Sequence, residues 1–207
     1  MRNKIRIGIV VSVVVVVNAL LIYNVSGVSS GHTEEVKLPK LVIETGDLVF
    51  RNGHGLISRM FQNCSLKEKK YGHSGIVILR DNIPYVAHVQ QDRPGPSLIV
   101  EPLSQFWNKS ICNEGAVYRL DLNNSQMENF KKVLHTNLRK KIIFDAKFDM
   151  NEHSSVYCSE WIHDLVIETT GDSSYFPISV AGNFKYIALD NLYLNQHAQL
   201  IYNYSKK

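Results

Sequence analysis

The stretch that decides the fold lies at residues 72–89 and reads GHSGIVILRDNIPYVAHV. Two runs within it, 74–79 and 83–89, are rich in β-branched and aromatic residues and have the composition of β-strands. Between them stand Asp81 and Asn82, residue types that suit a tight turn. The stretch therefore predicts a β-hairpin that turns at these two residues.

This hairpin carries two histidines. His73 opens its first strand, and His88 lies near the end of its second strand. The midpoint between the two positions falls close to the turn, so we expect the two imidazoles to be direct neighbours across an antiparallel ladder. Such a pair has the chemistry of a base and its orienting partner, because a neutral imidazole can orient another one as a carboxylate would.

Segments on both sides of the hairpin predict the rest of an α+β domain. The helix at 125–141 is expected to begin with a capping box of Ser125 and Glu128. The strands precede the two long helices, so we expect an antiparallel sheet packed against helices, with the Tyr-rich tail at 175–204 packing back on it. Further strands are expected at 46–50, 98–103 and 115–122, and helices at 55–62, 125–141 and 156–170.

Cys158 lies near the start of the last of these helices. The dipole of a helix favours a thiolate at its N-terminus. A thiol nucleophile also needs a base within reach and a third group that orients the base. Cys158, His73 and His88 therefore predict a site for nucleophilic catalysis by a thiol.

Four motifs of this kind follow one another along the chain and resemble a known family. The set is similar to the YiiX/YebB-like family of circularly permuted papain-fold thiol hydrolases, in the NlpC superfamily. In that family the His-bearing strands precede the Cys-bearing helix, which reverses the usual papain order. The resemblance covers about residues 41–185. The motifs are Gly46-Asp47-Leu48-Val49-Phe50, Gly55-Leu56-Ile57-Ser58, Gly72-His73-Ser74-Gly75-Ile76-Val77 and Tyr157-Cys158-Ser159-Glu160-Trp161-Ile162.

The resemblance implies a circularly permuted papain-like (NlpC-type) fold, with an antiparallel sheet or barrel against helices. It makes Cys158 the nucleophile and His73 the general base. The third residue falls on His88, where many members have a carboxylate and the lecithin:retinol acyltransferase-like branch has a histidine; Glu101 is the rival for this position. The departure leaves open whether the enzyme hydrolyses or transfers acyl groups.

The segment before the Cys-bearing helix resembles an aromatic and acidic loop of the same family. Within and after it, Asp145 and Tyr157 are the candidates for binding substrate. The alternative for this loop is a structural role in shaping the cleft and capping the helix. Glu160 is expected to point away from the thiol and to stabilise the first turn of the helix.

The first residues of the chain have the pattern of an export signal. Three basic residues precede an apolar stretch, and residues 5–25 are about as long as the roughly 20 residues that cross a bilayer. We therefore expect a signal peptide or transmembrane anchor at 1–30, a linker at 31–40 and a single domain at 41–207. Basic residues before the apolar segment stay in the cytoplasm, so the domain is expected outside it, in the periplasm or cell envelope.

Charge and cysteine content narrow the function further. The chain has 207 residues and a net charge of +4, of which three charges belong to residues 1–30. The nearly neutral remainder argues against nucleic acid as a partner. The other two cysteines, Cys64 and Cys112, either form a disulfide or remain free thiols. A zinc site made by Cys158 and the two histidines is disfavoured, since no Cys-x2-Cys pair is present, and no cofactor is expected.

The sequence thus predicts an exported or membrane-tethered cysteine hydrolase of the peptidase or amidase type. Its partners would be the membrane, through residues 5–25, and a peptide or a lipid-linked amide or ester as substrate. The chemistry would pass through a thioester between the substrate's acyl group and the thiol. The alternatives are a lipid-directed thiol acyltransferase or esterase at the membrane, and a non-catalytic binding domain of the same fold.

Overall fold

The structure, a computed structural model, describes residues 43–53, 55–90, 96–108, 110–148, 150–151 and 154–205. The predicted leader and linker lie outside the described residues. Within the described part of the chain, no helix combines the length and the apolar character needed to cross a bilayer.

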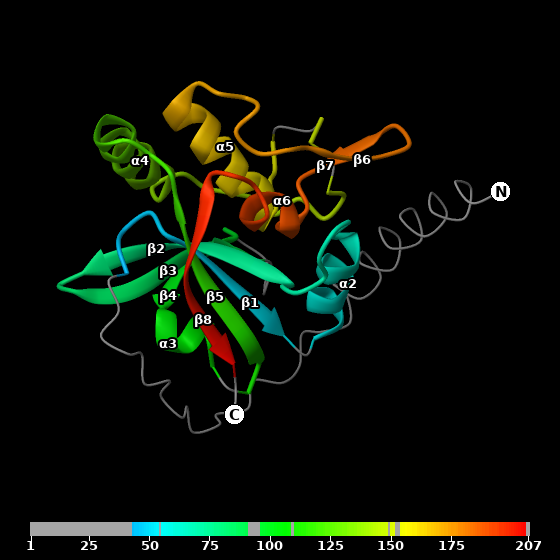
Figure 1. Ribbon diagram of the computed structural model, residues 1–207, viewed down its shortest axis with the longest axis horizontal. Helices are drawn as coiled ribbons and strands as arrows, with labels where there is room; N and C mark the ends of the chain where they lie inside the picture. The colour runs from blue at the N-terminus through cyan, green and yellow to red at the C-terminus, as the bar shows by residue number, and fades with distance from the viewer. Residues whose placement is uncertain are drawn as a thin grey trace.

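An antiparallel sheet of six strands forms the centre of the molecule (Figure 1). The strand order is β4-β3-β2-β1-β5-β8, so the predicted hairpin lies inside an open sheet and not at its edge. All five strands expected from the sequence are present, and β8 is an addition at one edge. Their bounds are β1 (Leu48–Gly53), β2 (His73–Arg80), β3 (Ile83–Val89), β4 (Leu98–Pro102), β5 (Cys112–Leu120) and β8 (Ala198–Ser205).

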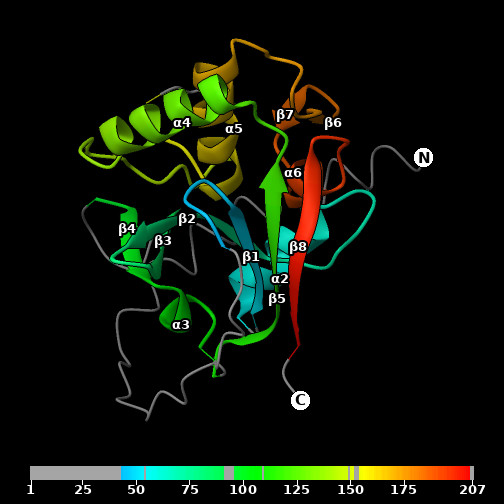
Figure 2. The ribbon, with the colours of Figure 1, turned by 60° about the vertical axis from the view of Figure 1, so that its left-hand side comes forward.

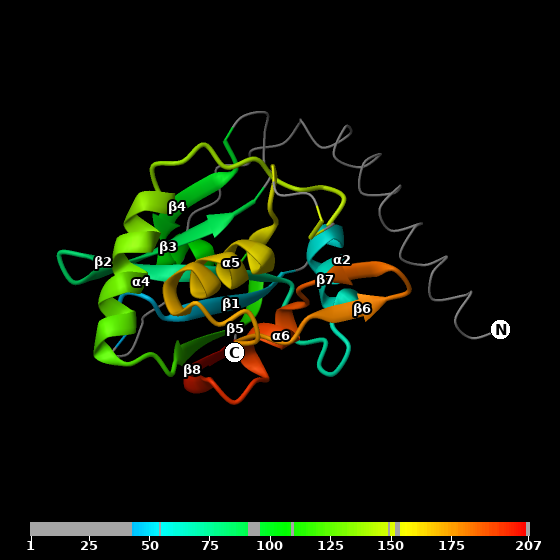
Figure 3. The same cartoon turned by 90° about the horizontal axis from the view of Figure 1, so that it is seen from above.

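Helices cover both faces of this sheet. The two long helices, α4 (Asn124–Asn137) and α5 (Cys158–Thr170), lie over one face, as the view from above shows (Figure 3). The short helix α3 (Leu103–Phe106) lies on the other side of the strands (Figure 2). The remaining elements are α2 (Leu56–Cys64), α6 (Leu189–Tyr193) and a two-stranded sheet of β6 (Ser179–Ala181) and β7 (Phe184–Tyr186).

The period-two alternation of the strands explains why there are two hydrophobic cores. In β1, Leu48 and Phe50 pack into the core under α4 and α5, whereas Val49 points into the core that contains α3. In β2, Ile76 and Val77 divide between the two cores in the same way. The beginning of β1 and of β2 is therefore buried on both faces of the sheet, and the polar side chains of His73 and Ser74 are enclosed by protein.

The register of the hairpin differs from the expected one by two residues. Asp81 and Asn82 both have positive φ angles, 51° and 62°, as a two-residue type I′ turn requires. With Ile76 opposite Ala87, the ladder brings Gly75 opposite His88. The two imidazoles are therefore neighbours across the hairpin, as expected, but they lie on a diagonal and not at directly opposite positions.

The helix α4 begins and ends earlier than expected. Its cap is Asn123, whose side chain accepts a hydrogen bond from the Gln126 amide, while the Gln126 side chain accepts one from the Asn123 amide. The predicted box of Ser125 and Glu128 is wrong, because asparagine is an equally strong N-cap two residues earlier. The helix α5 ends as expected at Gly171, which has a positive φ of 72°.

The tail packs back on the domain and adds β8, which the sequence analysis did not foresee. This strand pairs with β5, where Gly115 lies opposite Tyr204. The Tyr204 ring stacks on Trp107, with the ring centroids 5.5 Å apart. Trp107 in turn donates a hydrogen bond from Nε1 to the carbonyl of Phe50. The tail therefore closes the core on the α3 side.

Candidate active site

Cys158 is the first residue of α5 and is buried, with 1 % of its surface exposed. Its position leaves the backbone amides of the first helical turn without partners inside the helix. The preceding residue is fixed by Glu160, whose Oε2 accepts a hydrogen bond from the Tyr157 amide at 3.3 Å. This contact matches the expected role of Glu160 in the first turn. The thiol is thus held at the amino end of a helix, inside the protein.

The acidity of the thiol differs from the expected one. Burial raises the pKa of Cys158 above its ordinary value, and this outweighs the lowering by the Ser74 hydroxyl and by nearby amides of Ser74 and Ser159. The Ser74 hydroxyl lies near enough to act on the sulfur, although it forms no hydrogen bond of regular geometry. The resting group is therefore a thiol and not the thiolate that the helix dipole alone would favour.

His73 is the first residue of β2 and has 9 % of its surface exposed. Its ring stacks on Phe106 of α3, with 5.7 Å between the ring centroids. Burial, followed by the positive charge of Arg51 and by His88, holds the pKa of His73 well below its ordinary value. The imidazole is therefore neutral near pH 7 and has a lone pair with which to accept a proton.

His73, His88 and Glu101 form a chain of hydrogen bonds. His73 Nε2 lies 2.9 Å from His88 Nδ1, and His88 Nε2 lies 3.1 Å from Glu101 Oε1. The two candidates for the third position are therefore not rivals in the structure, since one follows the other. Sequence reasoning treated them as alternatives because their strands, β3 and β4, had no known register.

The carboxylate of Glu101, at one end of this chain of hydrogen bonds, determines which nitrogen of each imidazole carries the proton. An ionised carboxylate only accepts hydrogen bonds, so Glu101 requires a proton on His88 Nε2. His88 Nδ1 of the neutral ring is then an acceptor and takes its hydrogen bond from His73 Nε2–H. The remaining nitrogen, His73 Nδ1, carries the lone pair. The hydrogen bonds thus leave Nδ1 as the nitrogen of His73 that can act as a base.

Gly75 makes room for this arrangement. A side-chain methyl at this position would lie 2.5 Å from Val86 Cγ1, 2.9 Å from the Ala87 carbonyl oxygen and 3.1 Å from His88 Cβ. Only a residue without a Cβ allows β3 to approach so closely. The His88 ring can then extend across Gly75 to the diagonal position at His73.

The sulfur and His73 meet at the beginning of β2 without a hydrogen bond between them. Cys158 packs against Ser74, on the face under α5, and the His73 ring lies on the side of Phe106. The thiol of α5 therefore lies beside Ser74, the β2 residue that directly follows His73. In free enzymes such contacts are often long and tighten when substrate binds.

Both predicted substrate-binding residues are inside the protein. The Tyr157 hydroxyl accepts a hydrogen bond of 2.7 Å from the Ile187 amide, and 1 % of the residue is exposed. Asp145 is also buried and accepts a hydrogen bond from the Lys147 amide at 2.7 Å. The first contact ties the residue before α5 to the segment between β7 and α6, and the second closes a turn in the loop before α5. A role in substrate binding stays a prediction for both residues.

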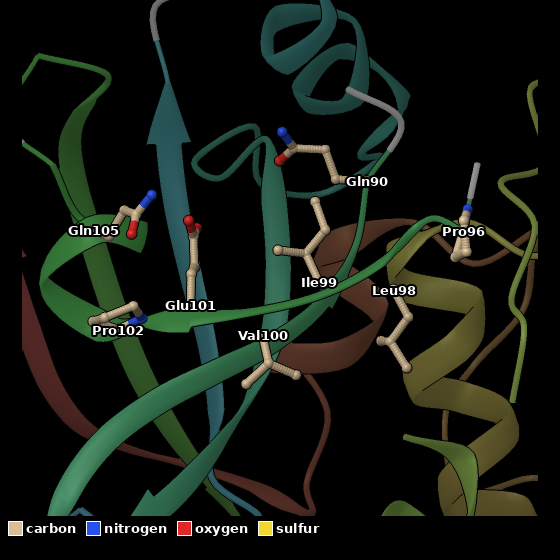
Figure 4. Close-up of a pocket in the computed structure, with 8 residues that line it drawn as sticks. All are labelled: Gln90, Pro96, Leu98, Ile99, Val100, Glu101, Pro102 and Gln105. Carbon is tan, nitrogen blue, oxygen red and sulfur yellow. The ribbon is translucent and has the colours of Figure 1, made fainter. Parts of the chain in front are cut away.

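A cavity of about 430 Å³ adjoins the carboxylate end of the hydrogen-bonded chain (Figure 4). It is bounded by β4, where Ile99 and Glu101 point to one side and Leu98 and Val100 to the other. Cys158 and His73 are not among its lining residues. The lining comprises Gln90, Pro96, Leu98, Ile99, Val100, Glu101, Pro102 and Gln105.

The described residues contain neither a disulfide nor a cluster of metal ligands. Cys64, Cys112 and Cys158 are all free thiols, so no disulfide joins the first two. In the described ranges, no three histidine, cysteine or acidic side chains come together as ligands for a metal ion. The nitrogens that His73 and His88 turn toward each other are used in their mutual hydrogen bond, so this donor set does not fit a metal.

Comparison with known proteins identifies the family of the chain. Residues 42–175 match the family of permuted papain-like amidase enzymes, YaeF/YiiX, C92 family. The chain belongs to this family. Its fold is similar to a crystal structure of metalloprotein yiiX from Escherichia coli O157:H7, with a TM-score of 0.59 and 15% sequence identity. That similarity covers 79% of this chain and 98% of the other. No curated protein sequence matches the chain.

Family membership confirms the predicted resemblance and the permuted papain-like fold. It also places the chain among amidase- or peptidase-like enzymes, in agreement with a cysteine hydrolase. Arg51 and Phe106, which enclose the imidazoles, were not predicted from the sequence. Neither lies in a recognisable motif, because they reach His73 only through strand pairing and the packing of α3.

Proposed function

We propose that this chain is an exported or membrane-tethered cysteine hydrolase that cleaves amide bonds through a thioester on Cys158. The observation that carries the proposal is the buried thiol at the start of α5, beside the strand position that follows His73. The hydrogen-bonded chain behind His73 supplies the orientation that a general base needs. His73 is then the base, His88 orients it, and Glu101 orients His88.

The first half of the reaction acylates the thiol. His73 Nδ1 accepts the proton of the Cys158 thiol as the sulfur attacks the carbonyl carbon of the substrate, and a carbon–sulfur bond forms. The raised pKa of the thiol and the lowered pKa of His73 favour proton transfer during attack over a resting ion pair. The carbon–nitrogen bond then breaks, and the protonated imidazole returns its proton to the leaving amine.

The negative charge that develops on the carbonyl oxygen needs donors. The backbone amides of Cys158 and Ser159 are in the first turn of α5, where helix geometry provides them with no intrahelical acceptor. Both lie near enough to the sulfur to influence its pKa. We assign them as the oxyanion donors.

The second half of the reaction releases the acyl group. Water attacks the thioester carbon while His73 accepts a proton from it, the carbon–sulfur bond breaks, and the thiol regains its proton. The products are a carboxylic acid and a free enzyme. If the alcohol or amine group of a lipid takes the place of water, the same steps give an acyltransferase.

The substrate class follows from the family and from the leader. An amidase-like family favours a peptide or another amide as substrate. The basic and apolar leader favours a position at the membrane, with the domain in the periplasm or cell envelope. A cell-wall peptide is then the first candidate, and a lipid-linked amide or ester is the second.

The test is to incubate the full-length chain with cell-wall peptides and, separately, with lipid amides and esters. Products and the mass of the peptide containing Cys158 are followed by mass spectrometry. We expect a new amine and acid from the true substrate, and a hydroxylamine-sensitive acyl group on Cys158. Acyl transfer to an added lysolipid, with no free acid, would instead identify the acyltransferase alternative.

Two matched variants test whether catalysis requires Cys158 itself or can use another cysteine of the protein. Cys158→Ala is expected to abolish both turnover and acylation, whereas Cys64→Ala keeps them because Cys64 lies at the end of α2. Full turnover by Cys158→Ala would refute the proposal. Absence of turnover and acylation with every substrate class, from a chain that is folded, would favour the non-catalytic binding domain.

A further inference from the structure

The side chain of Arg51 joins four parts of the molecule next to the histidine pair. Its Nη1 donates a hydrogen bond of 3.0 Å to the Phe106 carbonyl, and its Nη2 donates one of 2.8 Å to Gln90 Oε1. Nη1 also lies 3.9 Å from Glu101 Oε1, in an ion pair. The Arg51 side chain is 11% exposed, so water screens these contacts little.

The same arginine is linked to His73 through a ring and through the backbone. Its guanidinium lies over the Phe106 ring at 4.4 Å, and the other neighbours of that ring are His73 and His88. In the ladder of β1 and β2, Arg51 is directly opposite His73. The Arg51 carbonyl also accepts a hydrogen bond of 2.9 Å from the Gly72 amide, which fixes the chain immediately before the base.

We propose that Arg51 is a positioning residue that, together with burial, keeps His73 neutral and aligned, and thereby extends the enzyme's working range to lower pH. This proposal rests on the role of His73 as the general base in the proposed function. Arg51 acts on His73 in two ways. Its fixed positive charge disfavours a second positive charge on the imidazole, and its contacts hold Phe106, the surface on which that imidazole stacks.

The effect of charge on the protonation of His73 depends on every group that faces its ring. Arg51 from β1 disfavours protonation, as does His88 from β3 whenever it is charged. Glu101 from β4 acts in the opposite direction through His88, while Phe106 from α3 and Cys158 from α5 bring no charge at neutral pH. Arg51 is the permanent cation in this set. Its removal should therefore raise the pKa of His73.

The experiment measures the titration of His73 directly by NMR in the full-length chain, with its signals assigned by loss in His73→Gln. In Arg51→Gln we expect the midpoint to move upward by about one pH unit, the size typical of a nearby charge. The acidic limb of kcat/KM against pH should move by the same amount, since His73 must be unprotonated to accept the thiol's proton. In Arg51→Lys, which keeps the charge, the midpoint should stay within about a third of that shift.

Two further variants decide between charge and disruption. Glu101→Gln removes a negative charge from the same cluster and should move the midpoint of His73 downward. Arg119→Gln removes an arginine of the neighbouring strand β5, which pairs with Asp47 and Glu44 away from the histidines, and should leave the midpoint unchanged.

An unchanged midpoint in a folded Arg51→Gln would overturn the proposal, and so would upward shifts in both Arg51→Gln and Glu101→Gln. If Arg51→Gln does not fold, the Glu101→Gln and Arg51→Lys titrations carry the test alone, and a shift in Arg51→Lys as large as one unit would overturn it. The NMR titration does not depend on turnover. A shifted midpoint in a chain that lacks hydrolase activity would support the electrostatic role while refuting the proposed function.

Discussion

Each residue of the hydrogen-bonded chain is expected to matter less the farther it lies from the reacting atoms. His73 transfers the proton itself, His88 orients His73, and Glu101 fixes the tautomer of His88. Because the carboxylate acts through two rings, its loss leaves the base in place and removes the preference for one tautomer together with one negative charge. A graded loss of activity would distinguish three groups that act together, His73, His88 and Glu101, from a histidine pair in which Glu101 has no role.

Substitutions should therefore reduce kcat/KM in a graded series. His73→Ala is expected to cost about 10²–10⁴-fold, the usual contribution of general acid–base catalysis. His88→Ala should cost about 10–100-fold, and Glu101→Gln less than that, as is typical of groups that orient a functional residue. Steady-state kinetics on the substrate that the product assay identifies measure all three. A larger loss in Glu101→Gln than in His88→Ala would contradict the proposed order.

At the scale of the element, the β2–β3 hairpin depends on the absence of a side chain at Gly75. We expect Gly75→Ala to destabilise the protein by about 1–3 kcal/mol, because the added methyl would meet the Ala87 carbonyl, which belongs to the backbone and cannot rotate away. Urea denaturation measures the change in the free energy of unfolding. Activity should also fall, since the methyl would press on His88.

Gly55 provides the control for this substitution. It lies at the start of α2, with a φ of −68° and no atom within 4 Å of an added methyl. Gly55→Ala is expected to change the free energy of unfolding by less than about 0.5 kcal/mol, as surface substitutions usually do. Equal effects of the two substitutions would show that close approach of β3 is not what requires a glycine at position 75.

The strand and helix boundaries depended to different degrees on local sequence. The turn at Asp81 and Asn82 and the stop of α5 at Gly171 were predictable, because each follows from the backbone preferences of one or two residues. The start of α4 was predicted two residues late, since several adjacent polar residues can cap a helix. Strand β8 was missed because its pairing with β5 joins segments about 85 residues apart.

At the scale of the whole molecule, the buried neutral His73 makes stability depend on pH. The pKa of His73 in the folded state is below the value of about 6.5 of an exposed histidine. Between these two values the unfolded chain binds more protons than the folded one, so protonation favours unfolding. Stability from this group is present above about pH 6.5 and is lost as the pH falls toward the folded-state pKa.

We therefore expect the free energy of unfolding to decrease on acidification, with a contribution from His73 of up to about 1.4 kcal/mol per pH unit. Urea titrations at a series of pH values between about 7.5 and about 5 measure the slope. The variant His73→Gln should have a shallower slope over the same range, because it removes the group that takes up the proton. Parallel curves for the two proteins would be inconsistent with a buried neutral histidine.

The sequence alone determined the parts of this protein that depend on short segments. Local residue preferences predicted the hairpin, its turn and the helix that carries Cys158. The resemblance to the family came from the four motifs and their order along the chain, and the family match confirms it. Such features are visible because the period of a strand or helix and the chemistry of a turn are properties of neighbouring residues.

The tertiary structure decided which side chains meet. The diagonal contact of the two imidazoles depends on a two-residue difference in register, and the approach of Glu101 and Arg51 depends on the order of four strands in one sheet. The acidity of Cys158 also changed direction, since burial raises its pKa more than the adjacent groups lower it. Register, strand order and burial arise from packing between distant segments, which no local pattern contains.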